Sequence, residues 1–216
     1  MDIVFLGTST DEKRFFLLCL AKILSFYKKV VIYSSKPYAF EEDLDQIYDC
    51  CGIEIHQFVK EENLTIRMEE ETYNFLDLEE FIPLQEGFKT VAICEPSRRI
   101  LEESVRLAEA FSWIQPSVGI SVVYLNLMEY CKASKKYLDL FWERSVPSFT
   151  KISEIYPFYF EEANRIVMLE SQFSDRLPIK ALTPSFKAGL TTIVQGLFNL
   201  EAKDTKDLLK KAERMK

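Results

Sequence analysis

The segment GTSTDEKR, residues 7–14, has the residue types and the spacing that could bind a phosphate group. The apolar run DIVFLG leads into it, and a second apolar run, FFLLCLAKIL, follows it. A glycine, five residues and then a lysine, between a strand and a helix, is where a phosphate-binding loop would lie. Gly7 and Lys13 would have those roles. The charged side chains of Glu12 and Arg14, on either side of the lysine, do not suit a phosphate-binding loop.

The composition restricts the class of protein. The chain has 216 residues, 48% of them hydrophobic and 28% charged, which fits one globular domain with a substantial core. No apolar stretch approaches the ~20 residues that a membrane span requires. The N-terminus opens directly into a strand-like run without the features of a secretion signal. We therefore expect a cytoplasmic protein.

The cysteines and the single histidine exclude several kinds of site. Five cysteines occur, at positions 19, 50, 51, 94 and 131, and His56 is the only histidine. Zinc-finger and HExxH spacings are therefore excluded, and we predict no metal site. Catalysis by His56 is disfavoured, because the residue alternates like the exposed side of a strand and no nucleophile motif accompanies it. The adjacent Cys50 and Cys51 are either a redox pair or, as we favour, two reduced thiols at a helix end.

The charge of the chain is unevenly distributed. The formal net charge is −7, and residues 41–80 hold 14 acidic and 2 basic residues. This asymmetry argues against nucleic acid as a partner. Residues 41–80 are either a solvated surface segment or an acidic docking surface for a basic protein partner.

Strand-like and helix-like segments alternate along the chain. Short apolar runs predict strands at 2–7, 28–35, 53–58, 72–78, 89–96, 119–127 and 151–156, the last ended by Pro157. Helical spacing predicts helices near 12–27, 41–51, 97–113, 134–144, 160–171 and 186–199. This alternation predicts an α/β, doubly wound fold, with helices on both faces of a mainly parallel sheet. We assign residues 1–200 to one domain and 201–216 to a basic helical tail.

The basic tail has two interpretations. Its apolar strip is thin and lacks aromatic residues, consisting of Leu208, Leu209, Ala212 and Met215. We favour a solvated or frayed helix. The alternative is peripheral contact with anionic lipids through the tail's lysines, for which the apolar strip is too thin to insert strongly.

Several fragments, in order over roughly residues 1–200, together resemble the MinD/ParA group of P-loop ATPases (SIMIBI class, deviant Walker motif). In that family the first strand runs into a KGGxGKT loop. Lys13 matches the phosphate-binding lysine, and Gly7 matches the residue before the signature lysine. TYNFLD resembles the Walker B strand and ends at Asp77, and VVYLN places Asn126 where a base-contacting asparagine often lies. SKKYLDLFWERSVPSFTKISEIYPFYFEEA is similar to the family's helix, strand and proline-bearing loop.

The loop departs from the family pattern at the positions that carry its chemistry. The degenerate positions are Thr8 for the signature lysine, Glu12 for a glycine, Arg14 for the Mg²⁺-binding threonine and Ser34 for an aspartate. A carboxylate from Glu12 would repel a phosphate ~4 Å away by roughly 4 kcal/mol at an effective dielectric constant near 20. Arg14 offers no hydroxyl to Mg²⁺. Asp11 and Glu12 in the first turn suit a helix N-terminus that carries no phosphate.

The resemblance with its departures implies a non-catalytic pseudo-ATPase that acts as a scaffold or localisation factor. Proteins of the TadZ/CpaE type, which position pilus or secretion machinery, are the model for this expectation. It implies protein partners, a homodimer, no required cofactor, and a place in the cytoplasm, at the inner face of the membrane or at a cell pole.

Two other interpretations stay open. In the first, the chain is a working ATPase switch with an atypical loop that binds ATP or ADP with Mg²⁺ through Gly7, Lys13, Asp77 and Asn126. In the second, the family does not apply, and the domain is another doubly wound fold of flavodoxin-like or receiver-like type. For Lys13 and Asp77, whichever family applies, the alternative to a role in nucleotide binding is that Lys13 is a solvated first-turn lysine and Asp77 one more acid in an acidic segment.

Overall fold

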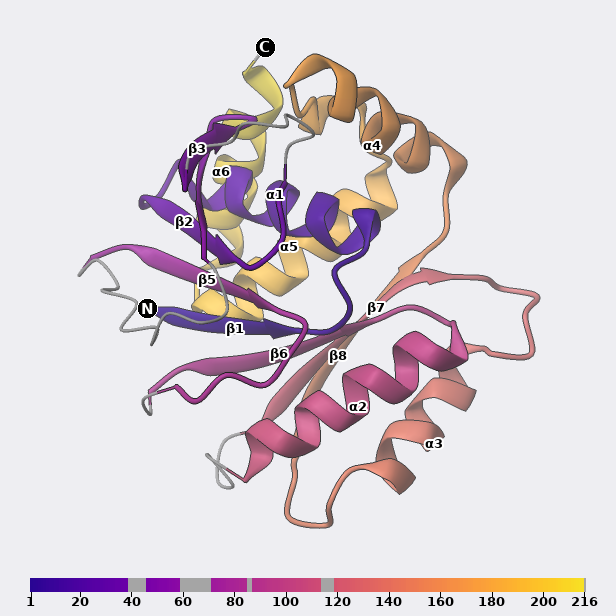
Figure 1. The fold of residues 1–216 in the computed structure, drawn as a ribbon. Helices are drawn as coiled ribbons and strands as arrows, with labels where there is room; N and C mark the ends of the chain where they lie inside the picture. The colour runs from indigo at the N-terminus through magenta and orange to yellow at the C-terminus, as the bar shows by residue number, and fades with distance from the viewer. Residues whose placement is uncertain (39–45, 59–70, 85–86, 114–118, 216) are drawn as a thin grey trace.

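One mainly parallel sheet runs through the protein (Figure 1). The structure, a computed structural model, describes residues 1–38, 46–58, 71–84, 87–113 and 119–215. Within these residues the sheet contains β1 (Asp2–Leu6), β2 (Val30–Ser34), β3 (Ile47–Cys50), β4 (Ile53–Gln57), β5 (Tyr73–Leu78), β6 (Lys89–Cys94), β7 (Ile120–Leu127) and β8 (Ile152–Tyr159). The strand order is β3-β4-β2-β5-β1-β6-β7-β8. All neighbouring strands are parallel except β3 and β4, which are antiparallel.

Helices cover both faces of this sheet. The helices of the described residues are α1 (Asp11–Leu24), α2 (Arg98–Ser112), α3 (Lys135–Ser145), α4 (Glu162–Ser174), α5 (Pro184–Phe198) and α6 (Ala202–Arg214), with a short 3₁₀ turn, η1 (Ile179–Ala181). Figure 1 shows α1, α4, α5 and α6 on one side of the sheet and α2 and α3 on the other. The α/β, doubly wound fold predicted from the alternation of strands and helices is thus confirmed.

The strands are apolar on both sides because each side faces a layer of helices. In β1, Ile3 and Phe5 point into the core beneath α1, α5 and α6, whereas Val4 and Leu6 point into the core beneath α2 and α3. Helix α1 is apolar around most of its circumference because it is covered by the sheet on one side and by α5 and α6 on the other.

Two predictions of individual elements are wrong. Residues 41–51 were expected to be helical, but Ile47–Cys50 forms strand β3, which pairs with β4 through a two-residue turn, while 39–45 lie outside the described residues. Pro157 was expected to end a short strand, but β8 continues through it to Tyr159. Because β8 is an edge strand, one of its sides pairs with no other strand of the described sheet. A proline, which has no N–H to donate, is tolerated in such a strand.

Helix α6 packs onto the domain. It contacts α1, α5 and η1, and Leu208 and Ala212 belong to the buried core. Of the apolar strip considered above, Leu208 and Ala212 are buried and Leu209 is partly buried, while Met215 is 52% exposed. The interpretation of this segment as a solvated or frayed tail is therefore wrong, because α6 packs against α1, α5 and η1. Among the described residues, no helix combines the length and the apolar character that crossing a bilayer demands.

Candidate functional site

The candidate loop lies at the carboxyl ends of the central strands, between β1 and α1. Gly7 leaves β1 with φ +137°, and Thr10 is the N-cap of α1, its hydroxyl oxygen accepting a hydrogen bond from the N–H of Lys13 at 3.2 Å. An ideal Cβ on Gly7 would lie 2.2 Å from the carbonyl oxygen of Ile93 on β6. The glycine is thus required by a close approach of the loop to the neighbouring strand.

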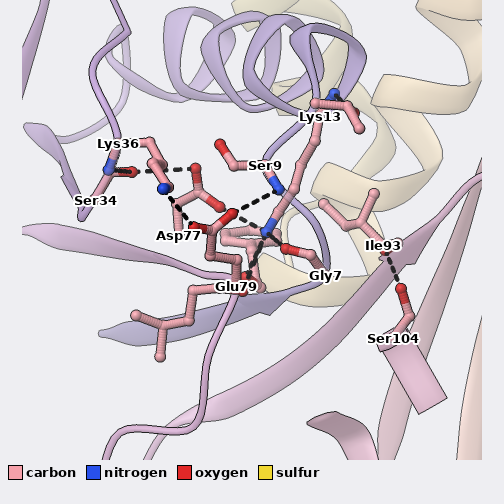
Figure 2. Close-up of polar contacts among 12 residues, drawn as sticks. Gly7, Ser9, Lys13, Ser34, Lys36, Asp77, Glu79, Ile93 and Ser104 are labelled. Carbon is pink, nitrogen blue, oxygen red and sulfur yellow. Dashed lines mark hydrogen bonds and ion pairs between the residues drawn. The ribbon is translucent and has the colours of Figure 1, made fainter. Parts of the chain in front are cut away.

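The side chain of Lys13 turns beneath the loop and is buried. Its Nζ lies 2.6 Å from Oδ1 of Asp77, and both side chains are 1% exposed. The same ammonium donates to the backbone carbonyl of Gly7 at 2.7 Å (Figure 2), and to those of Phe5 at 3.1 Å and Leu78 at 3.3 Å. Burial lowers the pKa of Lys13, and the nearby carboxylate of Asp77 opposes this effect. The interpretation of Lys13 as a solvated lysine is therefore wrong, and Asp77 is its buried ion-pair partner.

Asp77 is held from its other side by two hydroxyl groups. Its Oδ2 accepts a hydrogen bond from the hydroxyl of Tyr38 at 2.8 Å and from Ser34 at 3.4 Å. Burial, with the negative charge of Asp77, raises the pKa of the Tyr38 phenol well above its usual value. Ser34, predicted as a degenerate position, thus lies directly against Asp77.

Three carboxylates accept hydrogen bonds from the loop. They are Glu103, bound by the Thr8 hydroxyl at 2.8 Å, Glu79, bound by the Ser9 N–H at 3.4 Å, and Glu95, bound by the Thr10 hydroxyl at 2.7 Å. The hydrogen bond from Thr8 lowers the pKa of Glu103, and a further one from Arg99 adds to the effect. Donors that a phosphate would need are therefore already bound to negatively charged side chains of the same chain.

The two charged residues that flank Lys13 point away from the loop. Glu12 forms an ion pair with Arg165 on α4. Arg14 pairs with Asp11 and donates to the carbonyl of Pro37 at 3.0 Å. The expectation that Glu12 places its carboxylate beside a phosphate is therefore wrong, because Arg165 draws that carboxylate toward α4.

Asn126 is hydrogen-bonded to Glu95, and it lines a small pocket together with Glu12. It is the next-to-last residue of β7 and lies in the left-handed region, with φ 55°, a conformation that asparagine adopts more readily than most residues. Its Nδ2 donates to Oε2 of Glu95 at 3.3 Å, while Oε1 of the same carboxylate accepts from Thr10. Asn126 is thus connected to the candidate site by one intervening carboxylate.

The space next to the loop is lined by charges of both signs. A pocket of about 470 Å³ is bordered by Thr8, Glu79, Glu103, Arg99 and Arg106, together with Glu80 and a few apolar side chains. A larger and more apolar pocket, of about 780 Å³, lies beyond the ends of β7 and β8, and its lining includes no residue of 7–14. The space on the loop is therefore polar and rich in carboxylates.

His56 stands outside this arrangement. It lies on β4, which β2 and β5 separate from β1 in the sheet, and its Nε2 is 2.6 Å from Oε1 of Glu54. The expectation that His56 is not part of the candidate site is consistent with this position.

The sequence therefore identified Gly7, Lys13 and Asp77, which the fold brings together, but missed the surrounding carboxylates. Glu79 and Glu95 directly follow β5 and β6, so the rule that sites gather at the carboxyl ends of parallel strands could have found them. Glu103 comes from the middle of α2, and no local signal marks it.

Comparison of the chain with protein-family models gives no match, and comparison with curated proteins gives none. The resemblance to the MinD/ParA group therefore rests on the sequence fragments alone and stays a prediction.

Proposed function

We propose that the protein is a non-catalytic pseudo-ATPase of MinD/ParA-like fold that acts as a scaffold or localisation factor, in a pilus or secretion assembly of the TadZ/CpaE kind. The observation that carries this proposal is the state of Lys13. An ammonium has three N–H donors, and this one has a carboxylate and three carbonyl oxygens as acceptors. Moving it to a phosphate would break all of these contacts and leave Asp77 buried without its cation.

The carboxylates around the loop support the same proposal. Two like unit charges ~4 Å apart repel by roughly 4 kcal/mol at an effective dielectric constant near 20, which is about three orders of magnitude in affinity. Glu79, Glu95 and Glu103 all accept hydrogen bonds from the loop. A triphosphate entering there would meet these three carboxylates, two of which are also paired with cations, Glu79 with Lys36 at 2.9 Å and Glu103 with Arg99 at 3.0 Å. It would have to displace these partners and the loop donors, so a working phosphate loop is disfavoured.

The second candidate is an ATPase switch with an atypical loop. The observation that favours it is the proximity of Gly7, Lys13 and Asp77, because a phosphate ligand and an acid for Mg²⁺ must meet at one strand end. In that case Asn126 would contact the base. The two candidates differ in a direct binding measurement.

Calorimetric titration with Mg-ATP and with Mg-ADP is expected to give no binding heat at millimolar nucleotide. The physical reason is that the Lys13 ammonium is already bound to Asp77 and three carbonyl oxygens, and that carboxylates accept the hydrogen bonds of the loop. The control variant is Lys13→Met with Asp77→Asn, which removes both charges of the buried pair while keeping similar shapes. Micromolar binding by the wild type that this double variant loses would contradict the pseudo-ATPase and favour the switch.

The protein partner we infer first is a second copy of the chain, docked through helix α4. Ile166, Leu169 and Phe173 form one exposed stripe on this helix, and they are 48%, 41% and 91% exposed. Their spacing of three and four residues places them on one face. Exposed Glu162 is the first residue of α4, and exposed Arg176 follows the helix after Asp175. An antiparallel α4 pair would set Phe173 against Ile166 of its partner, with Leu169 near the centre.

The described part of the acidic segment gives less support for docking. Residues 39–45 and 59–70, which contain many of the acids of 41–80, lie outside the described residues. The docking surface predicted there thus stays a prediction, and the α4 stripe carries the inference about a partner.

Leu169→Glu is expected to weaken self-association at least about tenfold. In the antiparallel α4 pair, residue 169 of each copy lies near the two-fold axis, so the substitution would bury two carboxylates next to each other. Size-exclusion chromatography coupled to light scattering, over a series of protein concentrations, measures the degree of self-association. Leu140→Glu is the matched control, since Leu140 is 40% exposed on α3, on the opposite side of the sheet. A monomeric wild type, or equal effects of the two substitutions, would argue against this interface.

A further inference from the structure

The hairpin between β3 and β4 brings two thiol groups to the same side of the chain. Cys50 ends β3, and Cys51 and Gly52 make the turn with φ of 56° and 79°. In a regular strand adjacent side chains point to opposite faces. Because Cys51 is in the left-handed conformation, both cysteines instead enter the same core cluster, where they are 6% and 7% exposed.

A carboxylate from a distant part of the chain completes this cluster. Asp175 follows the last residue of α4, and its Oδ1 accepts a hydrogen bond from the N–H of Cys51 at 3.1 Å. This bond orients the carboxylate toward the hairpin. The two sulfur atoms and a carboxylate oxygen all lie within 4.8 Å of one another.

These distances suit a tetrahedral cation. Zn²⁺ lies about 2.3 Å from thiolate sulfur and about 2.0–2.2 Å from carboxylate oxygen, so its ligand atoms are about 3.5–3.8 Å apart. The ligand atoms of Cys50, Cys51 and Asp175 would need only small side-chain rotations to reach this spacing. Asp175 is exposed, which leaves a route for the cation and a fourth coordination position on the solvent side.

The charges of the cluster would also balance. Lys22 is 8% exposed, and its ammonium donates to the carbonyl of Cys51 at 2.7 Å. Two thiolates, one carboxylate, one divalent cation and this ammonium sum to zero; the neighbouring Asp49, which is exposed and accepts a hydrogen bond from the N–H of Gly52 at 2.8 Å, stands outside this sum. A neutral cluster avoids the penalty of an uncompensated charge in a buried position.

We propose that Cys50, Cys51 and Asp175 form a binding site for a thiophilic divalent cation of the Zn²⁺ type. Each thiol releases its proton to solvent when its sulfur bonds to the metal. The bound cation would join the β3–β4 hairpin at the edge of the sheet to the end of α4. This inference does not depend on the proposed scaffold function.

The test is titration of the reduced 216-residue chain with Cd²⁺. Binding is monitored through the ultraviolet absorption band of thiolate-to-metal charge transfer. We expect one Cd²⁺ per chain, displaced by Zn²⁺, and loss of the absorption band in Cys50→Ser and in Cys51→Ser. Asp175→Asn is expected to weaken binding by about tenfold or more. Asparagine suits this position because its side-chain carbonyl preserves an acceptor for the Cys51 N–H and it tolerates φ of 48°.

Cys131→Ser is the matched control, because Cys131 is exposed and lies outside the cluster. This variant is expected to bind like the wild type. Saturating Zn²⁺ is also expected to raise the thermal midpoint by roughly 5 °C in the wild type and in Cys131→Ser, but not in Cys51→Ser. The site would be overturned by a charge-transfer band that Cys131→Ser abolishes, by the absence of a band in the wild type, or by unchanged affinity in Asp175→Asn. The last variant decides the question if a serine variant fails to fold.

Discussion

Lys13→Met is expected to lower the free energy of unfolding by about 3–5 kcal/mol. The variant keeps the length of the apolar stem but removes the ammonium that lies 2.6 Å from Asp77. Asp77 is buried, so its carboxylate would be left as a buried charge that, among the described residues, keeps the hydroxyls of Tyr38 and Ser34 as hydrogen-bond donors. Breaking one partner of a buried pair is more destabilising than removing both.

Urea denaturation followed by circular dichroism measures this effect. The double variant Lys13→Met with Asp77→Asn is the control, because it removes both charges and leaves an amide in place of the carboxylate. We expect the double variant to recover most of the lost stability. If Lys13→Met lowered the free energy of unfolding by less than about 1 kcal/mol, the ammonium would have to be solvated, and the inference that it is unavailable to a phosphate would lose its basis.

Gly7→Ala is expected to lower the free energy of unfolding by about 4 kcal/mol or more, through two effects. The first is backbone strain, because φ of +137° at residue 7 disfavours any residue with a Cβ. The second is a collision, because the new Cβ would lie 2.2 Å from the backbone oxygen of Ile93. That oxygen is held in β6 and accepts a hydrogen bond from Ser104 at 3.0 Å, so it has little freedom to move.

Gly87→Ala separates the two effects. Gly87 also has positive φ, +107°, but a Cβ added there has no other atom within 4 Å. This variant is expected to destabilise by only about 1–2 kcal/mol, from backbone strain alone. The difference in the free energy of unfolding between the two variants measures the close approach of the loop to β6. Equal losses in the two variants would mean that the loop and β6 are further apart than described.

The fold class was predictable because its signal is local and repeated. Apolar runs such as 2–7 and 89–96 must be covered on both faces, and the alternation with helices leaves few arrangements other than a doubly wound sheet. The two wrong elements depended on contacts outside the segment. Ile47–Cys50 becomes a strand because β4 offers it an edge, and β8 continues through Pro157 because no strand pairs with its other side.

For the candidate site, the sequence by itself determined that Gly7, Lys13 and Asp77 meet, but not that Glu79, Glu95 and Glu103 surround them. Gly7, Lys13 and Asp77 stand at the ends of β1, α1 and β5, and parallel strands bring those ends to one edge of the sheet. Only the tertiary structure decided where their side chains point. Lys13 turns under the loop because Asp77 and three carbonyl oxygens lie there, and Glu12 turns away because Arg165 on α4 attracts it. Residue spacing specifies position along one element, whereas the direction of a long charged side chain depends on partners supplied by other elements.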